Sequence, residues 1–228
     1  MPRVPPPPRY QGTPCRHLLP AGTVLYRVHR RSWASSAFSA LAADVLFGGG
    51  RLDPTVDDSY PYLYAAFSER TALVEVLLRS VPIDERGTRI LPQATVRDRR
   101  LSSILLTTKV NLLALTTSPE LAAVGQDEWL VHAGPRDYPQ TRGWAHWLRR
   151  QAPWAQGLIW PSKRDPGERA VILFGDRCRP GDLQPGDLQP VDLDDGHGVK
   201  WLNDMLAGYR VTIQPPTDQQ VATGGATS

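Results

Sequence analysis

Arg51 directly follows the three glycines Gly48-Gly49-Gly50. Glycine lets the backbone take conformations that other residues avoid, so such a loop can approach a ligand closely. An arginine at the end of this loop would then point at the ligand. A flexible loop whose arginine is merely solvated is an equally good interpretation of the local sequence.

Three further polar residues have types suited to a reactive site: Glu75, Tyr64 and Ser162. Glu75 lies at the margin of an apolar helical stripe, Tyr64 lies in a short apolar run, and Ser162 directly follows Pro161. Each also has an ordinary interpretation, as a surface glutamate, a core tyrosine and a turn serine. Taken singly, none of them identifies a site.

Several common chemistries lack their motifs in this chain. There is no GxSxG nucleophile motif, no GxGxxG after a strand and no GxxxxGK[ST], and the single plausible site carboxylate does not make the pair used by ordinary glycosidases. Cleavage of one glycosyl bond needs only one carboxylate: in NAD the nicotinamide is already a cationic pyridinium and leaves as a neutral molecule, so no general acid is required. Glu75 would stabilise the oxocarbenium charge, Arg27 and Arg51 would neutralise the diphosphate, and Tyr64 would pack on nicotinamide.

The elements that must position these residues are short, and strands outnumber helices. Ser68 predicts the N-cap of a helix over residues 69–79, which would carry Glu75. A second amphipathic helix is expected over residues 141–150. Strands are expected over residues 23–29, 62–66, 89–96, 101–107, 157–161 and 170–174. This pattern predicts an α+β fold.

The chain divides by composition into a core and two extensions. Residues 1–15 contain the run Pro5-Pro6-Pro7-Pro8 and are predicted to form a proline-rich tail. The core is expected over residues 16–178. Residues 179–228 form an extension that repeats Gly-Asp-Leu-Gln-Pro twice in succession, has a short helix at about residues 198–209, and is predicted to be disordered from residue 214 onward.

Composition argues against several classes of protein. The formal net charge of +3 comes from scattered arginines without a long basic run, so no direct nucleic-acid binding is expected. Cys15 and Cys178 are too few for a disulfide framework, and the five histidines lack metal-ligand spacing, so no metal is expected. No apolar run reaches the ~20 residues of a membrane helix, and the cytoplasm is the expected location.

The order of motifs resembles the RES-domain family of bacterial toxin–antitoxin systems, named for its characteristic arginine, glutamate and serine. The resemblance extends from about Thr23 to Asp176. The motifs that carry it are Leu25-Tyr-Arg27-Val, Gly50-Arg51-Leu, Tyr62-Leu-Tyr64-Ala-Ala, Thr71-Ala-Leu-Val-Glu75-Val, Asp137-Tyr with Thr141, and Gly157-Leu-Ile-Trp-Pro-Ser162. Leu52 and Trp160 depart from residues common in the family, which affects the expected shape of the pocket.

The resemblance implies an ADP-ribosyltransferase-like core of two small packed sheets with flanking helices, and an enzyme that cleaves the nicotinamide–ribose bond of NAD. Hydrolysis and phosphorolysis both remain open, and either would deplete cellular NAD. By this resemblance Arg27 and Arg51 would bind NAD and assist catalysis, Tyr64 would pack on nicotinamide, Glu75 would be catalytic, and Ser162 would complete the pocket.

The family also implies a protein partner, a small antitoxin of the Xre type whose tail blocks the cleft. Two other functions stay open from the sequence. One is mono-ADP-ribosyl transfer to a protein, and the other is a catalytically inert module that binds a nucleotide or another protein.

Overall fold

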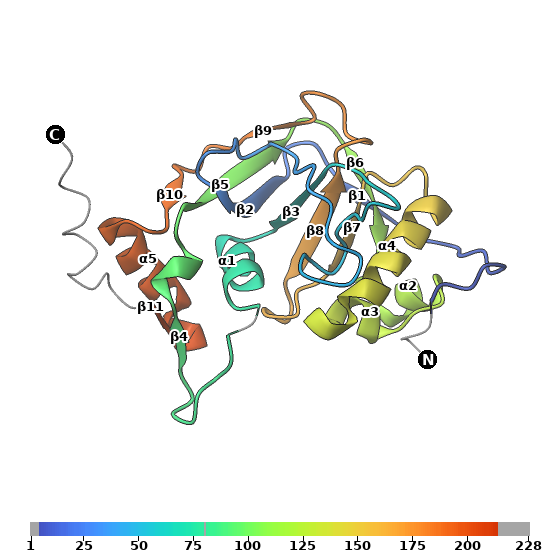
Figure 1. Ribbon diagram of the computed structural model, residues 1–228. Coiled ribbons are helices and arrows are strands. Elements are labelled where there is room, and N and C mark those ends of the chain that lie inside the picture. Colours follow the sequence, from blue (N-terminus) through green and yellow to red (C-terminus); the bar gives the residue numbers. More distant parts are fainter. Residues whose placement is uncertain (1–4, 80, 214–228) are drawn as a thin grey trace.

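The computed structural model describes residues 5–79 and 81–213, and nine of its strands form one large curled sheet (Figure 1). These strands are β1 (Arg16–Leu19), β2 (Val24–Arg30), β3 (Tyr62–Ala66), β5 (Arg99–Leu106), β6 (Val110–Ala114), β7 (Gly157–Pro161), β8 (Arg169–Phe174), β9 (Leu183–Pro185) and β10 (Val191–Asp192). Their order is β1-β6-β7-β8-β3-β2-β5-β10, with β9 also paired to β5. A small parallel sheet joins β4 (Arg89–Leu91) to β11 (Val211–Ile213). The predicted α+β class is confirmed.

Five α-helices pack against these sheets in the described part of the chain. They are α1 (Glu69–Leu77), α2 (Ser118–Ala122), α3 (Glu128–His132), α4 (Tyr138–Gln151) and α5 (Gly196–Leu206), and the 3₁₀ turns are η1 (Gln93–Thr95), η2 (Pro135–Asp137) and η3 (Ala207–Tyr209). Figure 1 shows α2, α3 and α4 together beside β7 and β8, α1 near the middle of the molecule, and α5 beside β10 and β11. No helix among the described residues is long and apolar enough to cross a membrane.

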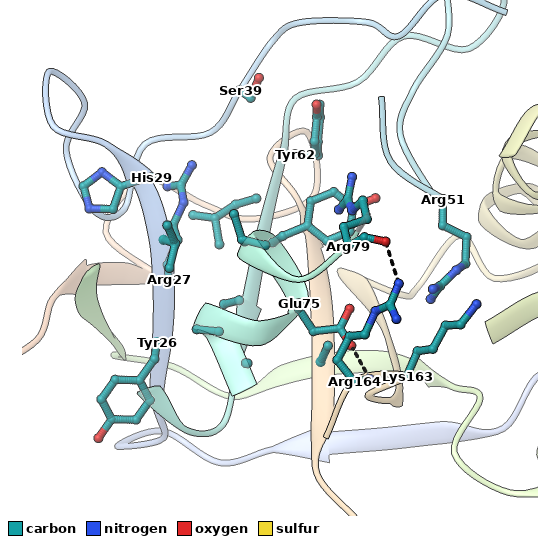
Figure 2. A pocket seen from close by; sticks show the side chains of 18 of the residues that line it. Tyr26, Arg27, His29, Ser39, Arg51, Tyr62, Glu75, Arg79, Lys163 and Arg164 are labelled. Atoms are coloured by element: carbon teal, nitrogen blue, oxygen red, sulfur yellow. Dashed lines mark hydrogen bonds between the residues drawn. The ribbon is translucent and has the colours of Figure 1, made fainter. Parts of the chain in front are cut away.

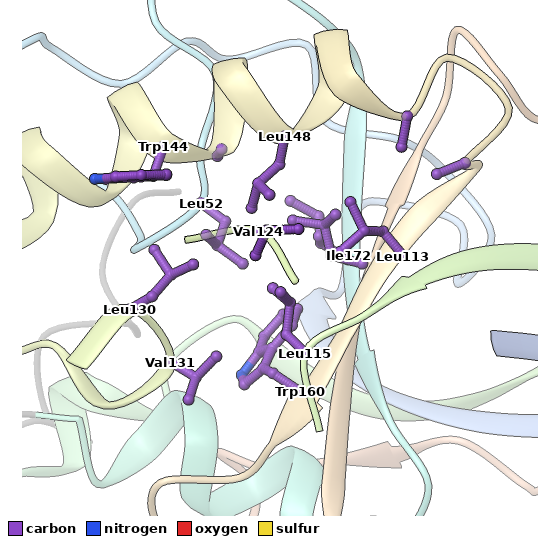
Figure 3. Packing of buried hydrophobic residues seen from close by; sticks show 14 of the residues in the cluster. Leu52, Leu113, Leu115, Val124, Leu130, Val131, Trp144, Leu148, Trp160 and Ile172 are labelled. Atoms are coloured by element: carbon purple, nitrogen blue, oxygen red, sulfur yellow. The ribbon is translucent and has the colours of Figure 1, made fainter. Parts of the chain in front are cut away.

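β8 lies in the middle of the large sheet, between β3 and β7. Its side chains alternate between two cores, as the period of two in a strand requires. Ile172 and Phe174 are buried in the core beneath α4, whereas Val171 and Leu173 are buried in the core on the opposite face. Figure 3 shows Ile172 in the first of these cores, packed among Leu113, Leu148 and Trp160.

Within the large sheet, β2 and β3 are the neighbouring strands with the fewest paired residues. These two strands share a single register pair, Tyr26 with Ala66, whereas β2 pairs with β5 at seven positions and β3 pairs with β8 at five. The two strands therefore diverge beyond that one pair, and the sheet is divided into two parts that are held together loosely along this line.

Most of the predicted elements are present. The strand at residues 62–66 is confirmed, and the helix predicted over residues 69–79 ends at Leu77. The strand predicted over residues 89–96 is wrong beyond Leu91, because Pro92 cannot donate to a ladder and the chain turns into η1.

The two extensions contact the core in their described residues. Tyr10 stacks on Trp147 of α4 with ring centroids 5.9 Å apart, and β9 and β10 both pair with β5. The predicted helix near residues 198–209 is present as α5 followed by η3. The predicted disorder of residues 214–228 lies outside the described residues.

Candidate active site

A cavity of about 350 Å³ lies where β2 and β3 diverge. Its walls come from these two strands, from α1, and from the segments that follow α3 and β7. Figure 2 shows Arg27 and His29 on β2 at one side of the cavity and Arg51 with Lys163 at the other, with Glu75 and Arg79 between them. The cavity therefore lies at the line where the two strands share only one register pair.

The cavity is strongly basic. Among the described residues, Glu75 is the only carboxylate that lines it. The basic side chains in its lining are Arg27, Arg30, Arg51, Arg79, Arg99, Lys163 and Arg164. This excess of positive charge suits an anionic ligand, and arginine binds phosphate with a planar fork of donors.

Glu75 reaches the cavity because of the way α1 is built. Ser68 caps the helix by accepting a 3.1 Å hydrogen bond from the backbone N–H of Thr71. The buried stripe of the helix consists of Thr71, Ala72, Leu73, Val74 and Leu77. Glu75 lies outside this stripe and is half-buried, so its carboxylate meets the cavity instead of the core.

Ser162 fixes one oxygen of that carboxylate. Its Oγ donates a 2.6 Å hydrogen bond to Oε1 of Glu75, and it accepts from the backbone N–H groups of Arg164 at 3.2 Å and Asp165 at 3.0 Å. Because both N–H groups occupy the lone pairs of the hydroxyl, its single proton is directed to Glu75. Oε2 has no hydrogen-bond partner in the described part of the chain and is available to a ligand.

Arg51 presents a buried donor without a partner. Its side chain is 8% exposed, and its Nε has no hydrogen-bond partner among the described residues. Burial lowers the pKa of Arg51, an effect that the nearby Tyr138 and Glu75 oppose. A buried, unpaired guanidinium N–H is costly, so a ligand that accepts from it would stabilise this arrangement.

Helix α4 holds the loop that carries Arg51. Thr141 donates from Oγ1 to the carbonyl oxygen of Arg51 at 2.6 Å. The next residue, Arg142, is 1% exposed and donates to the carbonyls of Asp44, Gly48 and Gly50. The position of Arg51 therefore depends on a helix residue, Thr141, that lies 90 residues further along the chain.

Gly49 and Gly50 approach protein atoms, whereas nothing lies within 4 Å of a Cβ added to Gly48, and none of the three glycines lines the cavity. Gly49 has a φ of +67°, and a Cβ there would lie 2.6 Å from the Cβ of Ala43. A Cβ on Gly50 would lie 2.5 Å from Oδ1 of Asp53. The close contacts of Gly49 and Gly50 are with Asp53 and neighbouring side chains, and the expectation that the glycines approach a ligand stays a prediction.

Asp53 is a buried carboxylate that organises the loop. It accepts hydrogen bonds from the backbone N–H of Gly50 at 2.6 Å, from the hydroxyl of Tyr64 at 2.8 Å and from that of Tyr62 at 3.4 Å. Burial, followed by the charge of Asp53, raises the pKa of Tyr64 well above its usual value. Tyr64 is thus held as a neutral phenol whose ring lines the cavity, edge-on to Trp160.

Arg27 and His29 form the β2 wall. Nη1 of Arg27 donates to the carbonyls of Ser35 at 2.7 Å and Ala37 at 2.6 Å, and burial lowers its pKa to about 10. Burial, with a further contribution from the charge of Arg27, lowers the pKa of His29. Nδ1 of His29 lies 2.9 Å from the carbonyl of Arg30 and so carries the proton, which leaves Nε2 to accept from Ser102 at 2.9 Å.

The predicted site residues therefore meet at one place. Arg27, Arg51, Tyr64 and Glu75 all line the cavity. Ser162 is 2% exposed and contacts the cavity through Glu75 instead of lining it. No cluster of three or more possible metal ligands is found among the described residues.

Several lining residues were not predicted. Lys163 and Arg164 directly follow Ser162, so their proximity to the site could have been inferred from the sequence. Arg79 lies four residues after Glu75, a spacing that would place both side chains on one face of the helix predicted over residues 69–79, although α1 ends at Leu77. Arg30 and Arg99 gave no such signal, because only the pairing of β2 with β5 brings them together.

Comparison with known proteins agrees with this arrangement. The model of the RES domain family matches residues 24–195. Among solved structures, this chain is similar to one in the crystal structure of the M. tuberculosis MbcT–MbcA toxin–antitoxin complex, with a TM-score of 0.53 and 23% sequence identity. The match covers 77% of this chain and 86% of that chain, and it supports the α+β fold. No curated protein matches the sequence.

Proposed function

Because this chain belongs to the RES-domain family, we propose that it binds NAD in the cavity between β2 and β3 and cleaves the bond between nicotinamide and ribose. The observation that carries this proposal is the single carboxylate of Glu75, oriented by Ser162, in a cavity whose other charged side chains are basic. Cleavage of the nicotinamide–ribose bond needs one carboxylate and no general acid, which fits the charged side chains that line this cavity.

Arginines on both sides of Glu75 suit the diphosphate of NAD. Among the described residues, the buried Nε of Arg51 has no hydrogen-bond partner, and Arg27 uses only Nη1 to bind the protein, so its Nε and Nη2 can meet a ligand. Charge-assisted hydrogen bonds to phosphate are stronger than neutral ones. The two arginines would place the glycosidic bond against Glu75.

In the reaction, the C1′–N bond breaks and its electron pair moves to the nicotinamide nitrogen, which becomes neutral. The ribose then carries oxocarbenium charge. Oε2 of Glu75 is free to bind a ribose hydroxyl, and its negative charge stabilises the developing cation. The ring of Tyr64 would pack on nicotinamide, since its hydroxyl is already bonded to Asp53.

The acceptor that completes the reaction is either water or phosphate. Addition of water gives ADP-ribose and releases a proton, whereas addition of phosphate gives ADP-ribose 1″-phosphate. The basic side chains of Lys163 and Arg164 line the cavity close to Ser162 and would favour an anionic acceptor. This favours phosphorolysis as the first reaction to test.

The decisive experiment is to incubate the purified protein with NAD, with and without phosphate, and to follow nicotinamide release by chromatography. We expect Glu75→Gln to lower turnover by about 10²–10³-fold, because the charge is lost while the amide oxygen still accepts from Ser162. The matched control is Glu69→Gln, on the same helix but outside the cavity lining, which should keep wild-type turnover.

The product formed together with nicotinamide identifies the acceptor: ADP-ribose indicates water, and ADP-ribose 1″-phosphate indicates phosphate. If no nicotinamide is released under either condition, cleavage of free NAD is excluded, and transfer of ADP-ribose to a protein becomes the leading function. If Glu75→Gln releases nicotinamide as fast as the wild type, the catalytic role of Glu75 is wrong.

We also propose that the chain acts as a toxin restrained by a small antitoxin of the Xre type. The similar structure is described as a toxin–antitoxin complex. In this chain, Leu41, Leu46 and Phe47 are 65%, 62% and 73% exposed, and they lie just before the loop that carries Arg51. Large apolar side chains exposed together are typical of a protein-binding surface. Expression alone should lower cellular NAD and arrest bacterial growth, and normal growth with normal NAD would contradict a toxic role.

A further inference from the structure

Arg30 of β2 and Arg99 of β5 are direct partners across the sheet, and both line the cavity. Like charges placed directly opposite each other on neighbouring strands destabilise a sheet. Neither arginine forms an ion pair with a carboxylate in the described part of the chain. The side chain of Arg99 is half-buried, and its pKa is lowered by burial and then by the positive charges of Arg30 and Arg79.

The arginines that directly follow them in the sequence are neutralised. Nη2 of Arg31 lies 2.8 Å from Oδ2 of Asp194, and Nε of Arg100 lies 2.6 Å from Oδ1 of Asp192. Carboxylates are therefore present at this end of the sheet, yet they pair with the arginines that do not line the cavity. The repulsion between Arg30 and Arg99 would be relieved by an anion bound between them.

A tryptophan three residues after Arg30 also lines the cavity. The backbone N–H of Trp33 donates to the carbonyl of Arg30 at 3.0 Å, which folds the chain into a turn at the end of β2. Trp33 is half-buried and lines the cavity. A tryptophan ring is a good surface for stacking a nucleobase, so the adenine end of a nucleotide and an anion can be held side by side here.

We propose that Arg30 and Arg99 form a second phosphate subsite, beside an adenine-stacking Trp33, that binds the 2′-phosphate of NADP. This inference rests on the proposed function. NAD carries only its diphosphate, for which Arg27 and Arg51 suffice, whereas NADP carries an additional phosphate monoester on the ribose next to adenine. The cavity accordingly selects dinucleotides that bear this extra phosphate.

The test uses two fragments that lack the nicotinamide–ribose bond, adenosine 2′,5′-bisphosphate and adenosine 5′-monophosphate. Both are titrated calorimetrically into the full chain in phosphate-free buffer. We expect the bisphosphate to bind about tenfold more tightly or better, because it gains charge-assisted hydrogen bonds. Arg30→Gln should reduce this preference to within about twofold, and Arg99→Lys should weaken it by removing the fork of donors.

Arg31→Gln is the matched control, since it removes the same charge from the next residue and should retain the preference. Equal affinities of the wild type for the two fragments would overturn the proposal. It would also fall if Arg31→Gln reduced the preference as much as Arg30→Gln, or if Arg30→Gln weakened both fragments equally, because the pair would then bind the shared 5′-phosphate. If the protein releases nicotinamide from NAD but does not prefer the bisphosphate, only this subsite is refuted. If it prefers the bisphosphate but releases no nicotinamide, only the proposed reaction is refuted.

Discussion

The hydroxyl of Ser162 donates to Oε1 of Glu75 at 2.6 Å, although 87 residues separate them in the sequence. The first is placed by the end of β7 and the second by α1, so the pair exists only when the large sheet and its helix are packed together. Ser162 is therefore a positioning residue that acts through the carboxylate.

Replacement of Ser162 by alanine should lower the rate of nicotinamide release by about tenfold, the equivalent of one lost hydrogen bond to a charged group. The hydroxyl acts through Glu75, so the same replacement in the Glu75→Gln variant should cause little further loss. Steady-state rates of the four proteins give this comparison. If the double variant instead lost activity by the product of the two single effects, Ser162 would act independently of Glu75.

Arg51→Lys should raise the Kd for NAD by about tenfold to a hundredfold, because lysine keeps the charge but has no Nε donor and no planar fork. Calorimetry in the Glu75→Gln background measures this without consuming NAD. The control is Arg97→Lys, an exposed arginine outside the cavity lining. Unchanged affinity in Arg51→Lys would mean that the buried Nε does not meet the ligand.

Gly49→Ala should destabilise the loop that carries Arg51. The left-handed φ of +67° and a Cβ only 2.6 Å from the Cβ of Ala43 both oppose a side chain there. We expect a loss of about 2 kcal/mol in the free energy of unfolding. For a chain of this size, this loss corresponds to a fall of roughly 4–8 °C in the melting temperature.

The control for that variant is Gly143→Ala. Gly143 lies on α4 with nothing within 4 Å of its added Cβ, and alanine favours a helix over glycine. Gly143→Ala should therefore keep or raise the melting temperature. Equal melting temperatures for wild type and Gly49→Ala would contradict the described conformation of the loop.

Acid should destabilise the protein through its buried histidines. Burial and the charge of Arg27 lower the pKa of His29 below 6.5, so the folded chain resists a proton that the unfolded chain accepts. The stability contributed by neutral His29 is complete above about pH 6.5 and is lost as the pH falls through the folded-state pKa.

Melting temperatures between about pH 8 and pH 5 measure this effect. The melting temperature of His29→Gln should fall less steeply with decreasing pH than that of the wild type. Part of the fall should remain, because His132 and His146 also have lowered pKa values. The exposed His197 provides the control, and His197→Gln should follow the wild type. Parallel curves for wild type and His29→Gln would contradict the neutral state of His29.

Local sequence rules predicted the elements that carry the reactive groups. The cap at Ser68 and the apolar stripe of α1 placed Glu75 on a helix, and the apolar run at residues 62–66 placed Tyr64 on a strand. These features depend on neighbours within a few positions, and such signals can be read from one sequence.

Features set by distant pairing could not be read in this way. β6 is a short apolar run that periodicity alone does not separate from a helix, and β10 has only two residues. The burial of Asp53 beneath Tyr64 and the register that opposes Arg30 to Arg99 depend on the packed sheet. The residue types of the site were therefore predictable, whereas its electrostatic environment was not.

β8 is the last long strand to leave the ribosome, yet it occupies the centre of the large sheet and joins β3 to β7. A nascent chain that ends before Phe174 cannot close this sheet, so the segment with Ser162 has no fixed position relative to α1. Domains generally fold as units during synthesis. Whatever reaction the cavity supports thus becomes available only when translation of the domain is nearly complete.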